Sequence, residues 1–261
     1  MKYRDIVKEI EKIAPPELAE SWDNSGTQIY TGCEDITDVL VCLEITDDVI
    51  TEATESGAQL IISHHPLIFG GINRVDVDAD GRDAVTGRYI TRLIENGISA
   101  YSAHTSFDSA PEGNNYYLAK LLGLENIEGP SDELVGSIGF LSSPLSLDMA
   151  AELISERLDM PRERLRIAGA FDDKISKMAI CTGAGGIFLE DAVSLGCDLL
   201  ITGDVKFDQA QYARGAGISL IDAGHFDTEK IFVENFAAQL RELAPEIHVK
   251  ESTVNTDPFV L

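Results

Sequence analysis

The sequence predicts an α/β protein made of two related, interlocking lobes with largely parallel sheets. Short apolar runs alternate along the chain with segments of helical periodicity, which is typical of β-α-β units and parallel sheets. The sequence of residues 40–63 is also similar to that of residues 179–202 at a constant offset. Both segments predict a strand, a helix that ends at a glycine, and a second strand. We therefore expect an N-terminal lobe over 1–128 and a C-terminal lobe over 129–261, forming one structural unit with a metal site between them.

Periodicity and chain breakers place the elements of the first lobe. Pro15 and Pro16 stop the first helix, and Asn96 with Gly97 stops a later one. The expected helices are 3–13, 47–56, 83–96 and 114–122, and the expected strands are 39–43, 60–62 and one through Tyr101. Residues 70–81 are polar and acidic and are interpreted as a loop.

The second lobe follows a boundary segment at 125–132 and has the same alternation. Its expected strands are 135–141, 177–181, 199–201 and 219–221, and its expected helices are 147–158, 189–195, 208–213 and 229–243. His248 lies in the tail beyond Pro245 and is interpreted as structural.

Metal-ligand side chains follow three of the apolar runs, and four of the chain's five histidines lie there. The side chains are His64 and His65, His104 and Asp108, and His225 and Glu229. Ligands collect beyond the carboxyl ends of strands in open α/β sheets. Imidazole with carboxylate indicates Zn, Fe, Mn or Ni. Adjacent strand residues point to opposite faces, so we expect His64 and His65 to bind one each of two ions, roughly 3.5–4 Å apart.

Several of these residues also have an ordinary structural interpretation. Asp108 begins a good turn sequence, and Glu229 suits the first turn of a helix, where a carboxylate offsets the dipole. Four roles are open for His104: a further ligand, a group that orients Asp108, a general acid/base, or a plain structural residue. Asp23 and Asn24 either line the pocket or form a turn.

A glycine-rich segment, Thr182-Gly183-Ala184-Gly185-Gly186, follows a strand and precedes a helix. It resembles a loop that holds a phosphate, but it lacks the P-loop lysine and the third-glycine spacing of the dinucleotide fingerprint. Alone it is a weak signal, and the function it suggests is to seat an anionic substrate group beside the metals.

Five segments in order resemble the Nif-three-like dinuclear-metal hexamer family, also known as GTP cyclohydrolase I type 2 homologues. They are Trp22-Asp23-Asn24-Ser25-Gly26, His64-His65-Pro66-Leu67-Ile68-Phe69, His104 to Asp108, Ile201-Thr202-Gly203-Asp204, and Gly224-His225 with Glu229. Many members carry a histidine shortly after the Thr-Gly-acidic motif, where this chain has Lys206-Phe207-Asp208.

The resemblance implies two divalent transition-metal ions per chain, bound by His64, His65, Asp108, His225 and Glu229. It also implies a toroidal homohexamer and a GTP-cyclohydrolase-like hydrolase that uses a metal-bridging water, with a nucleotide or other small anionic substrate. His104 is our candidate for proton transfer. The alternative is a non-catalytic metal-binding scaffold that acts through protein partners, since fold and ligands alone do not define a reaction.

The net charge of the chain disfavours some classes of binding partner. The chain has 45 Asp and Glu against 20 Lys and Arg, a net charge of −25. Such a surface repels nucleic acid and anionic membrane, and it suits a salt-rich, halophilic cytoplasm where ions screen self-repulsion. We expect a cytoplasmic protein, because the N-terminus shows no signal-peptide pattern and no apolar stretch would span a membrane. The four cysteines form no Cys-x-x-Cys pair and are expected to be free thiols.

Overall fold

The computed structural model describes residues 1–261 apart from 73, 79–80, 132–134 and 260–261. The chain forms two compact units, Met1–Ala110 with Phe232–Leu261, and Pro111–Ile231. The α/β class with two sheets is confirmed. The division differs from the one expected at residues 128 and 129, because the second unit is inserted into the first and the chain returns to the first unit at Phe232.

The first unit has a five-stranded sheet whose four neighbouring strands β4, β3, β2 and β11 are parallel. The strand order is β1 (Gly26–Ile29), β4 (Ser99–Ser102), β3 (Leu60–Ser63), β2 (Asp38–Cys42) and β11 (His248–Glu251). Strand β1 pairs antiparallel with β4 at one edge. The central strands are buried on both faces, which explains why they read as continuous apolar runs.

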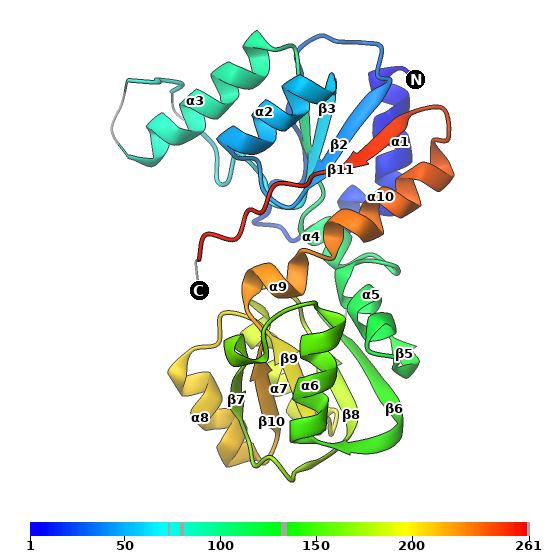
Figure 1. The fold of residues 1–261 in the computed structure, drawn as a ribbon, viewed down its shortest axis with the longest axis vertical. Helices are drawn as coiled ribbons and strands as arrows, with labels where there is room; N and C mark the ends of the chain where they lie inside the picture. Colours follow the sequence, from blue (N-terminus) through cyan, green and yellow to red (C-terminus); the bar gives the residue numbers. More distant parts are fainter. Residues whose placement is uncertain (73, 79–80, 132–134, 260–261) are drawn as a thin grey trace. The chain divides into compact units, whose positions relative to one another are not determined.

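Helices cover both faces of this sheet (Figure 1). Helices α1 (Tyr3–Ile13) and α10 (Phe232–Leu243) pack on one face, and α2 (Asp47–Ser56) and α3 (Arg82–Glu95) pack on the other. Thr46 caps α2 by accepting from the amide of Val49, and Gly57, at φ 73°, ends that helix in the left-handed conformation.

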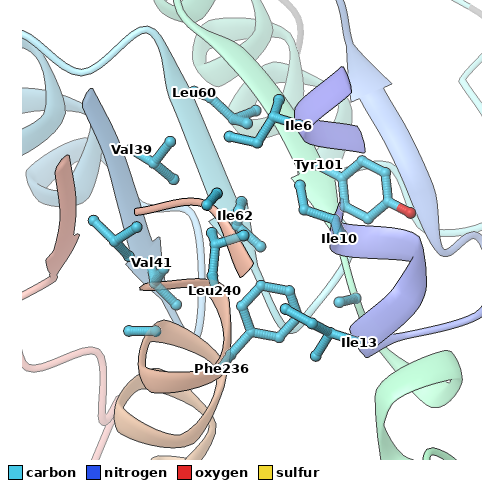
Figure 2. Packing of buried hydrophobic residues seen from close by; sticks show 14 of the residues in the cluster. Ile6, Ile10, Ile13, Val39, Val41, Leu60, Ile62, Tyr101, Phe236 and Leu240 are labelled. Atoms are coloured by element: carbon cyan, nitrogen blue, oxygen red, sulfur yellow. The ribbon is translucent and has the colours of Figure 1, made fainter. Parts of the chain in front are cut away.

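Alternation along the strands divides the core between the two faces. Figure 2 shows Val39, Val41, Leu60 and Ile62 of the sheet packed with Ile6, Ile10, Ile13, Phe236 and Leu240 of the helices. The intervening Leu40, Cys42 and Ile61 pack toward α2 and α3. The spacing of three and four in α1 therefore forms one apolar stripe, as its sequence predicts.

The second unit has a six-stranded mixed sheet. Its order is β5 (Glu125–Glu128), β6 (Ser137–Ser146), β8 (Lys174–Ile180), β9 (Leu199–Thr202), β10 (Ser219–Asp222) and β7 (Arg166–Ala168). Strands β8, β9 and β10 are parallel, and the other pairings are antiparallel. Helices α5 (Asn114–Leu121) and α6 (Leu147–Arg157) pack on one face, and α7 (Leu189–Ser194) and α8 (Phe207–Ala216) on the other.

The two units repeat one arrangement, as the similarity of residues 40–63 and 179–202 predicts. Strands β2, β3 and β4 lie side by side and parallel, and β8, β9 and β10 do the same in the same order. An antiparallel edge strand flanks each set, β1 beside β4 and β7 beside β10. A short helix follows the last parallel strand of each set, α4 (Thr105–Asp108) in the first unit and α9 (His225–Glu229) in the second.

The repeat includes an exchange of segments. Helix α5 follows α4 of the first unit but belongs to the second, where β5 then pairs with β6. Helix α10 follows α9 of the second unit but belongs to the first, where β11 then pairs with β2. Each unit therefore contains a helix and a strand that follow, in the chain, the short helix of the other unit.

Some elements differ from expectation. The expected helix 229–243 is two helices, and Glu229 ends α9 instead of opening the last helix. The strand expected at 135–141 begins at Ser137 and continues to Ser146. Edge strands β1, β5, β7 and β11 were not predicted. The described part of 70–81 contains no strand and no helix before Arg82, in agreement with a loop, while 73, 79 and 80 lie outside the described residues.

No helix within the described part of the chain is long and apolar enough to cross a membrane.

Candidate metal site

Three histidines of the first unit meet at the carboxyl ends of neighbouring parallel strands. His64 and His65 follow β3, and His104 follows β4. One ring nitrogen from each of the three lies within 4.8 Å of the others. Their ring centroids are 5.1 to 5.6 Å apart. The sequence placed these residues at strand exits, and the structure brings them together there.

Each of these rings is oriented by an acceptor at Nδ1. His64 Nδ1 lies 2.9 Å from the carbonyl oxygen of Ala103, and His65 Nδ1 lies 2.7 Å from a carboxylate oxygen of Glu44. His104 Nδ1 lies 2.7 Å from a carboxylate oxygen of Asp23. An acceptor at this position favours the tautomer that carries the ring proton on Nδ1. Metal-ligating histidines are held in the same way.

Asp108, the last residue of α4, adds a carboxylate to this group. Its Oδ2 lies 3.6 Å from Nε2 of the fully buried His64. The separation is too long for a hydrogen bond, and it places two potential ligand atoms side by side. A site of imidazole and carboxylate donors suits Zn, Fe, Mn or Ni.

Asp23 is the centre of a hydrogen-bond network around His104. Its side chain is fully buried, and it accepts from His104 Nδ1, the hydroxyl of Ser25, and both the amide and hydroxyl of Thr105. Burial by itself would raise the pKa of Asp23, but these hydrogen bonds outweigh it and hold the pKa well below its ordinary value. Asp23 is therefore a carboxylate that positions His104, and not only a turn residue.

Two aromatic rings cover His104. The ring of Trp22 lies 6.0 Å from that of His104, and the ring of Phe69 lies 6.3 Å from it. Trp22 and Phe69 are 59% and 57% exposed, so these large apolar groups remain at the surface beside the histidines. Exposed aromatic groups next to polar site residues are typical of a surface that contacts a ligand.

The second unit holds His225 and Glu229 on one face of α9. Their side chains are four residues apart, and Nε2 of His225 lies 2.9 Å from a carboxylate oxygen of Glu229. The expected placement on a common helical face is confirmed. His225 Nδ1 lies 2.8 Å from Asp204 Oδ2, so this fourth histidine also has its Nδ1 beside an acceptor. Asp204 adopts a left-handed backbone conformation, with φ 53°.

The glycine-rich loop packs against this pair. A Cβ atom on Gly183 would lie 2.0 Å from Glu229 Oε1, so glycine at this position makes room for the carboxylate. The amide of Gly183 donates to the hydroxyl of Thr228. A Cβ on Gly185 would lie 2.5 Å from Cys181 Sγ, and one on Gly186 would lie 2.4 Å from the Gln209 amide. Close packing thus accounts for the glycines, and a role in holding an anionic group stays a prediction.

The arrangement of candidate residues in the first unit is repeated in the second, as is the arrangement of strands. His104 and Asp108 are four apart on the short helix region after β4, and His225 and Glu229 are four apart after β10. Asp23 supports one histidine and Asp204 supports the other. Sequence reasoning missed Glu44, although an acidic residue two positions after a strand end was a signal of the same kind as the others.

Comparison with known proteins extends the likeness beyond short motifs. Residues 1–258 match the family model described as Duf34/NIF3 (NGG1p interacting factor 3). A Clostridium perfringens protein named GTP cyclohydrolase 1 type 2 homolog is 35% identical over 266 residues, covering 99% of both chains. A Lactococcus lactis protein of the same name is 33% identical, again covering 99% of both chains.

Solved structures share the fold along the full length. A hypothetical protein of Staphylococcus aureus is 29% identical with a TM-score of 0.90, covering 100% of this chain and 99% of that one. A Bacillus cereus protein related to NIF3 has the same TM-score and coverage at 24% identity. The resemblance read from five short segments therefore extends to the whole chain.

Proposed function

Because the chain belongs to the Duf34/NIF3 family, we propose that it is a dinuclear metal-binding protein that works as a metal-dependent hydrolase of the GTP cyclohydrolase type. One observation carries this proposal: all four candidate histidines have Nδ1 beside an acceptor, the arrangement in which proteins hold metal-ligating histidines. The names of the curated relatives support the choice of a GTP-like substrate.

We propose that His64, His65, Asp108, His225 and Glu229 bind two divalent transition-metal ions per chain. The donor set of imidazoles and carboxylates suits Zn, Fe, Mn or Ni. Two such ions, when bound, would lower the pKa of a water molecule toward neutrality and would polarise the group under attack. The carboxylate of Glu44 lies beside Nδ1 of His65, and that of Asp204 lies beside Nδ1 of His225. A negative charge at Nδ1 makes the imidazole a stronger electron-pair donor to a metal through Nε2.

His104 is proposed to transfer protons and not to bind metal. Its Nδ1–H group donates to the buried Asp23 carboxylate, so its Nε2 can accept a proton and the resulting imidazolium is stabilised by Asp23. The ring nitrogens of His64 and His65 lie within 4.8 Å of a ring nitrogen of His104, so this proton transfer would occur next to the proposed ligands.

The proposal extends to assembly and partners. We infer a homohexamer that takes a nucleotide or another small anionic molecule as substrate, with nucleic acid disfavoured by the net charge of −25. Several large apolar side chains are exposed on the second unit, including Ile187 at 76% and Phe207 at 78%. Exposed apolar groups of this size support burial in an assembly.

Elemental analysis and turnover together test the proposal. Protein purified without chelator should hold about two ions per chain. Glu229→Gln should lower that content while circular dichroism shows an intact fold, because glutamine keeps the shape and removes charge. Glu246→Gln, at an exposed position, is the control and should keep both ions.

The second part of the test separates catalysis from metal binding. Metal-loaded protein should open the GTP ring, and His104→Asn should keep the metal and lose turnover. Full metal content without turnover of GTP or other nucleotides would favour the non-catalytic scaffold instead. A chain that holds no transition metal after growth and reconstitution with Zn, Mn, Fe and Ni would contradict both functions.

A further inference from the structure

A cavity of about 350 Å³ lies within the first unit, and its wall includes Glu44, which accepts from His65, and Phe69, which lies beside His104. It is built at the carboxyl ends of β2 and β3, the position where open α/β sheets bind ligands. Glu44 and Ile45 follow β2, the segment Pro66 to Phe69 follows β3, and α3 supplies a third wall. Its volume falls at the small end of the roughly 300–1,000 Å³ range of ligand pockets.

The cavity has a mixed lining, in which apolar and aromatic residues alternate with the polar groups of Glu44, Arg74, Asp83 and Thr86. The apolar and aromatic residues are Ile45, Pro66, Leu67, Ile68, Phe69, Ile72, Val85 and Tyr89. The Pro66–Phe69 wall is held in place by the N-terminal loop, since Asn24 Nδ2 donates to the Ile68 carbonyl at 2.6 Å and the Ile68 amide donates to Gln28 Oε1 at 3.1 Å. Because hydrogen bonds hold one wall and Phe69 and Tyr89 line the cavity, it favours a rigid, aromatic ligand, for which little ordering is needed on binding.

Glu44 gives the cavity a charged hydrogen-bond acceptor. One of its oxygens accepts from His65 Nδ1 at 2.7 Å, and the side chain is 45% exposed and lines the cavity. A carboxylate has about four acceptor sites, so one hydrogen bond from His65 leaves capacity for further donors. Two adjacent N–H groups on a planar ring match the two oxygens of a carboxylate. Arg74 and Asp83 also line the cavity and are largely exposed, and Arg74 Nε lies 3.9 Å from Asp83 Oδ2.

We propose that this cavity binds a planar heteroaromatic ring with two adjacent N–H donors, of the kind found on guanine, with Glu44 as the acceptor. The inference rests on the proposed function, because it places the ring of the substrate beside the proposed ligand His65. Glu44 then contacts the ring and His65 at once, so the side chain that selects the substrate also orients a metal ligand.

The test measures binding of guanosine to the full chain by isothermal titration calorimetry, so that turnover is not needed. Val85→Trp fills the cavity from α3 and should weaken guanosine binding at least about tenfold, since it removes the volume for the ring. Ile94→Trp is the matched control, an exposed apolar residue on the same helix and outside the cavity wall. It should bind guanosine like the unaltered chain. Ile72→Trp fills the cavity from a lining residue outside α3 and serves if Val85→Trp does not fold.

A nucleoside series tests the role of Glu44 without altering it. Guanosine offers two adjacent N–H donors, inosine offers one, and adenosine presents a different edge. Affinity should fall about tenfold from guanosine to inosine and further to adenosine, because a hydrogen bond to a charged acceptor is lost at each step. Equal affinities for guanosine and adenosine, or guanosine binding that survives both filling variants, would overturn the inference.

Failure of the inference and failure of the proposed function give different results. Guanosine binding that Val85→Trp abolishes, in a protein without hydrolytic turnover, supports the cavity and contradicts the hydrolase. Turnover of GTP that both filling variants leave unchanged supports the hydrolase and contradicts the cavity.

Discussion

Asp23 and His104 are 81 residues apart in the chain, and a carboxylate oxygen of Asp23 lies 2.7 Å from Nδ1 of His104. The same carboxylate accepts from Ser25 and from the amide and hydroxyl of Thr105. One buried acid thus joins the loop before β1 to the end of β4, and it fixes the ring that we propose for proton transfer.

Asp23→Asn should destabilise the protein by about 2–3 kcal/mol, because it removes a buried charge that accepts several hydrogen bonds and places a donor amide among donors. Urea unfolding followed by circular dichroism measures the change. Asp172→Asn, on an exposed loop of the second unit, should change stability by less than about 0.5 kcal/mol. Equal effects of the two substitutions would show that the network around Asp23 contributes little.

Gly183→Ala should weaken metal binding about tenfold or more, because a Cβ atom there would lie 2.0 Å from Glu229 Oε1 and displace that carboxylate. Gly196→Ala is a close control, since the two glycines have φ of 63° and 67° and the space around Gly196 is open. Both variants should lose roughly 1–2 kcal/mol of stability from left-handed backbone strain. Only Gly183→Ala should lose metal on titration. Metal loss in both variants would assign the effect to the backbone alone.

Asp204→Asn should lower metal affinity by about 10- to 100-fold, because it removes the carboxylate that supports His225 from behind. Asparagine tolerates the left-handed conformation that Asp204 adopts at φ 53°, so the backbone should be retained. Asp159→Asn has the same backbone class, with φ 44° at an exposed position, and should leave affinity unchanged. Competition with a fluorescent chelator gives both affinities. Identical values would mean that Asp204 does not influence the site.

Cys197 should make the stability of the protein fall with rising pH above about pH 8.5, the ordinary pKa of an unfolded thiol. Burial raises the pKa of Cys197 to about 11 in the folded state. The unfolded chain therefore loses this proton first, and its deprotonation favours unfolding until the folded pKa is passed. Between about pH 8 and pH 10 the unfolding free energy should fall by about 2 kcal/mol more than in Cys197→Ala. Parallel slopes of the unaltered chain and the variant would contradict this.

Salt should stabilise the fold and the assembly, because a net charge of −25 repels itself most where screening is weak. The Debye length falls from about 30 Å at 0.01 M to about 3 Å at 1 M. Melting temperature should rise with KCl, and light scattering should approach six times the 28.3 kDa chain mass. Values that stay flat from about 0.05 M to about 3 M would identify an acidic protein without salt dependence.

The interior strands were predictable from sequence because they are buried on both faces. Residues 60–62 and 199–201 are unbroken apolar runs, and β3 and β9 are found there. Helices α1 and α2 begin and end where their breakers and caps indicate. The edge strands were missed for the opposite reason: β5 is mostly exposed and polar and therefore has no apolar pattern to recognise.

The candidate site was predictable where its residues follow strands, and not where they support other residues. The histidines could be placed because parallel strands end at a common edge. The pairing of Asp23 with His104 could not, since nothing local in either segment indicates a partner 81 residues away. The exchange of α5 and α10 was equally hidden, because an amphipathic helix shows that it packs on a sheet but not on which sheet.

That exchange has a consequence for how the protein is made. The second unit, Pro111–Ile231, is continuous in the chain and can close its core as soon as it leaves the ribosome. The first unit emerges earlier but cannot complete its core until α10 is made, because Phe232, Phe236 and Leu240 of α10 belong to the core that α1 packs against. The portion synthesised first is therefore the last to finish folding. Through most of translation, one apolar face of its sheet stays uncovered. Chaperones or rapid synthesis of α10 must then prevent aggregation.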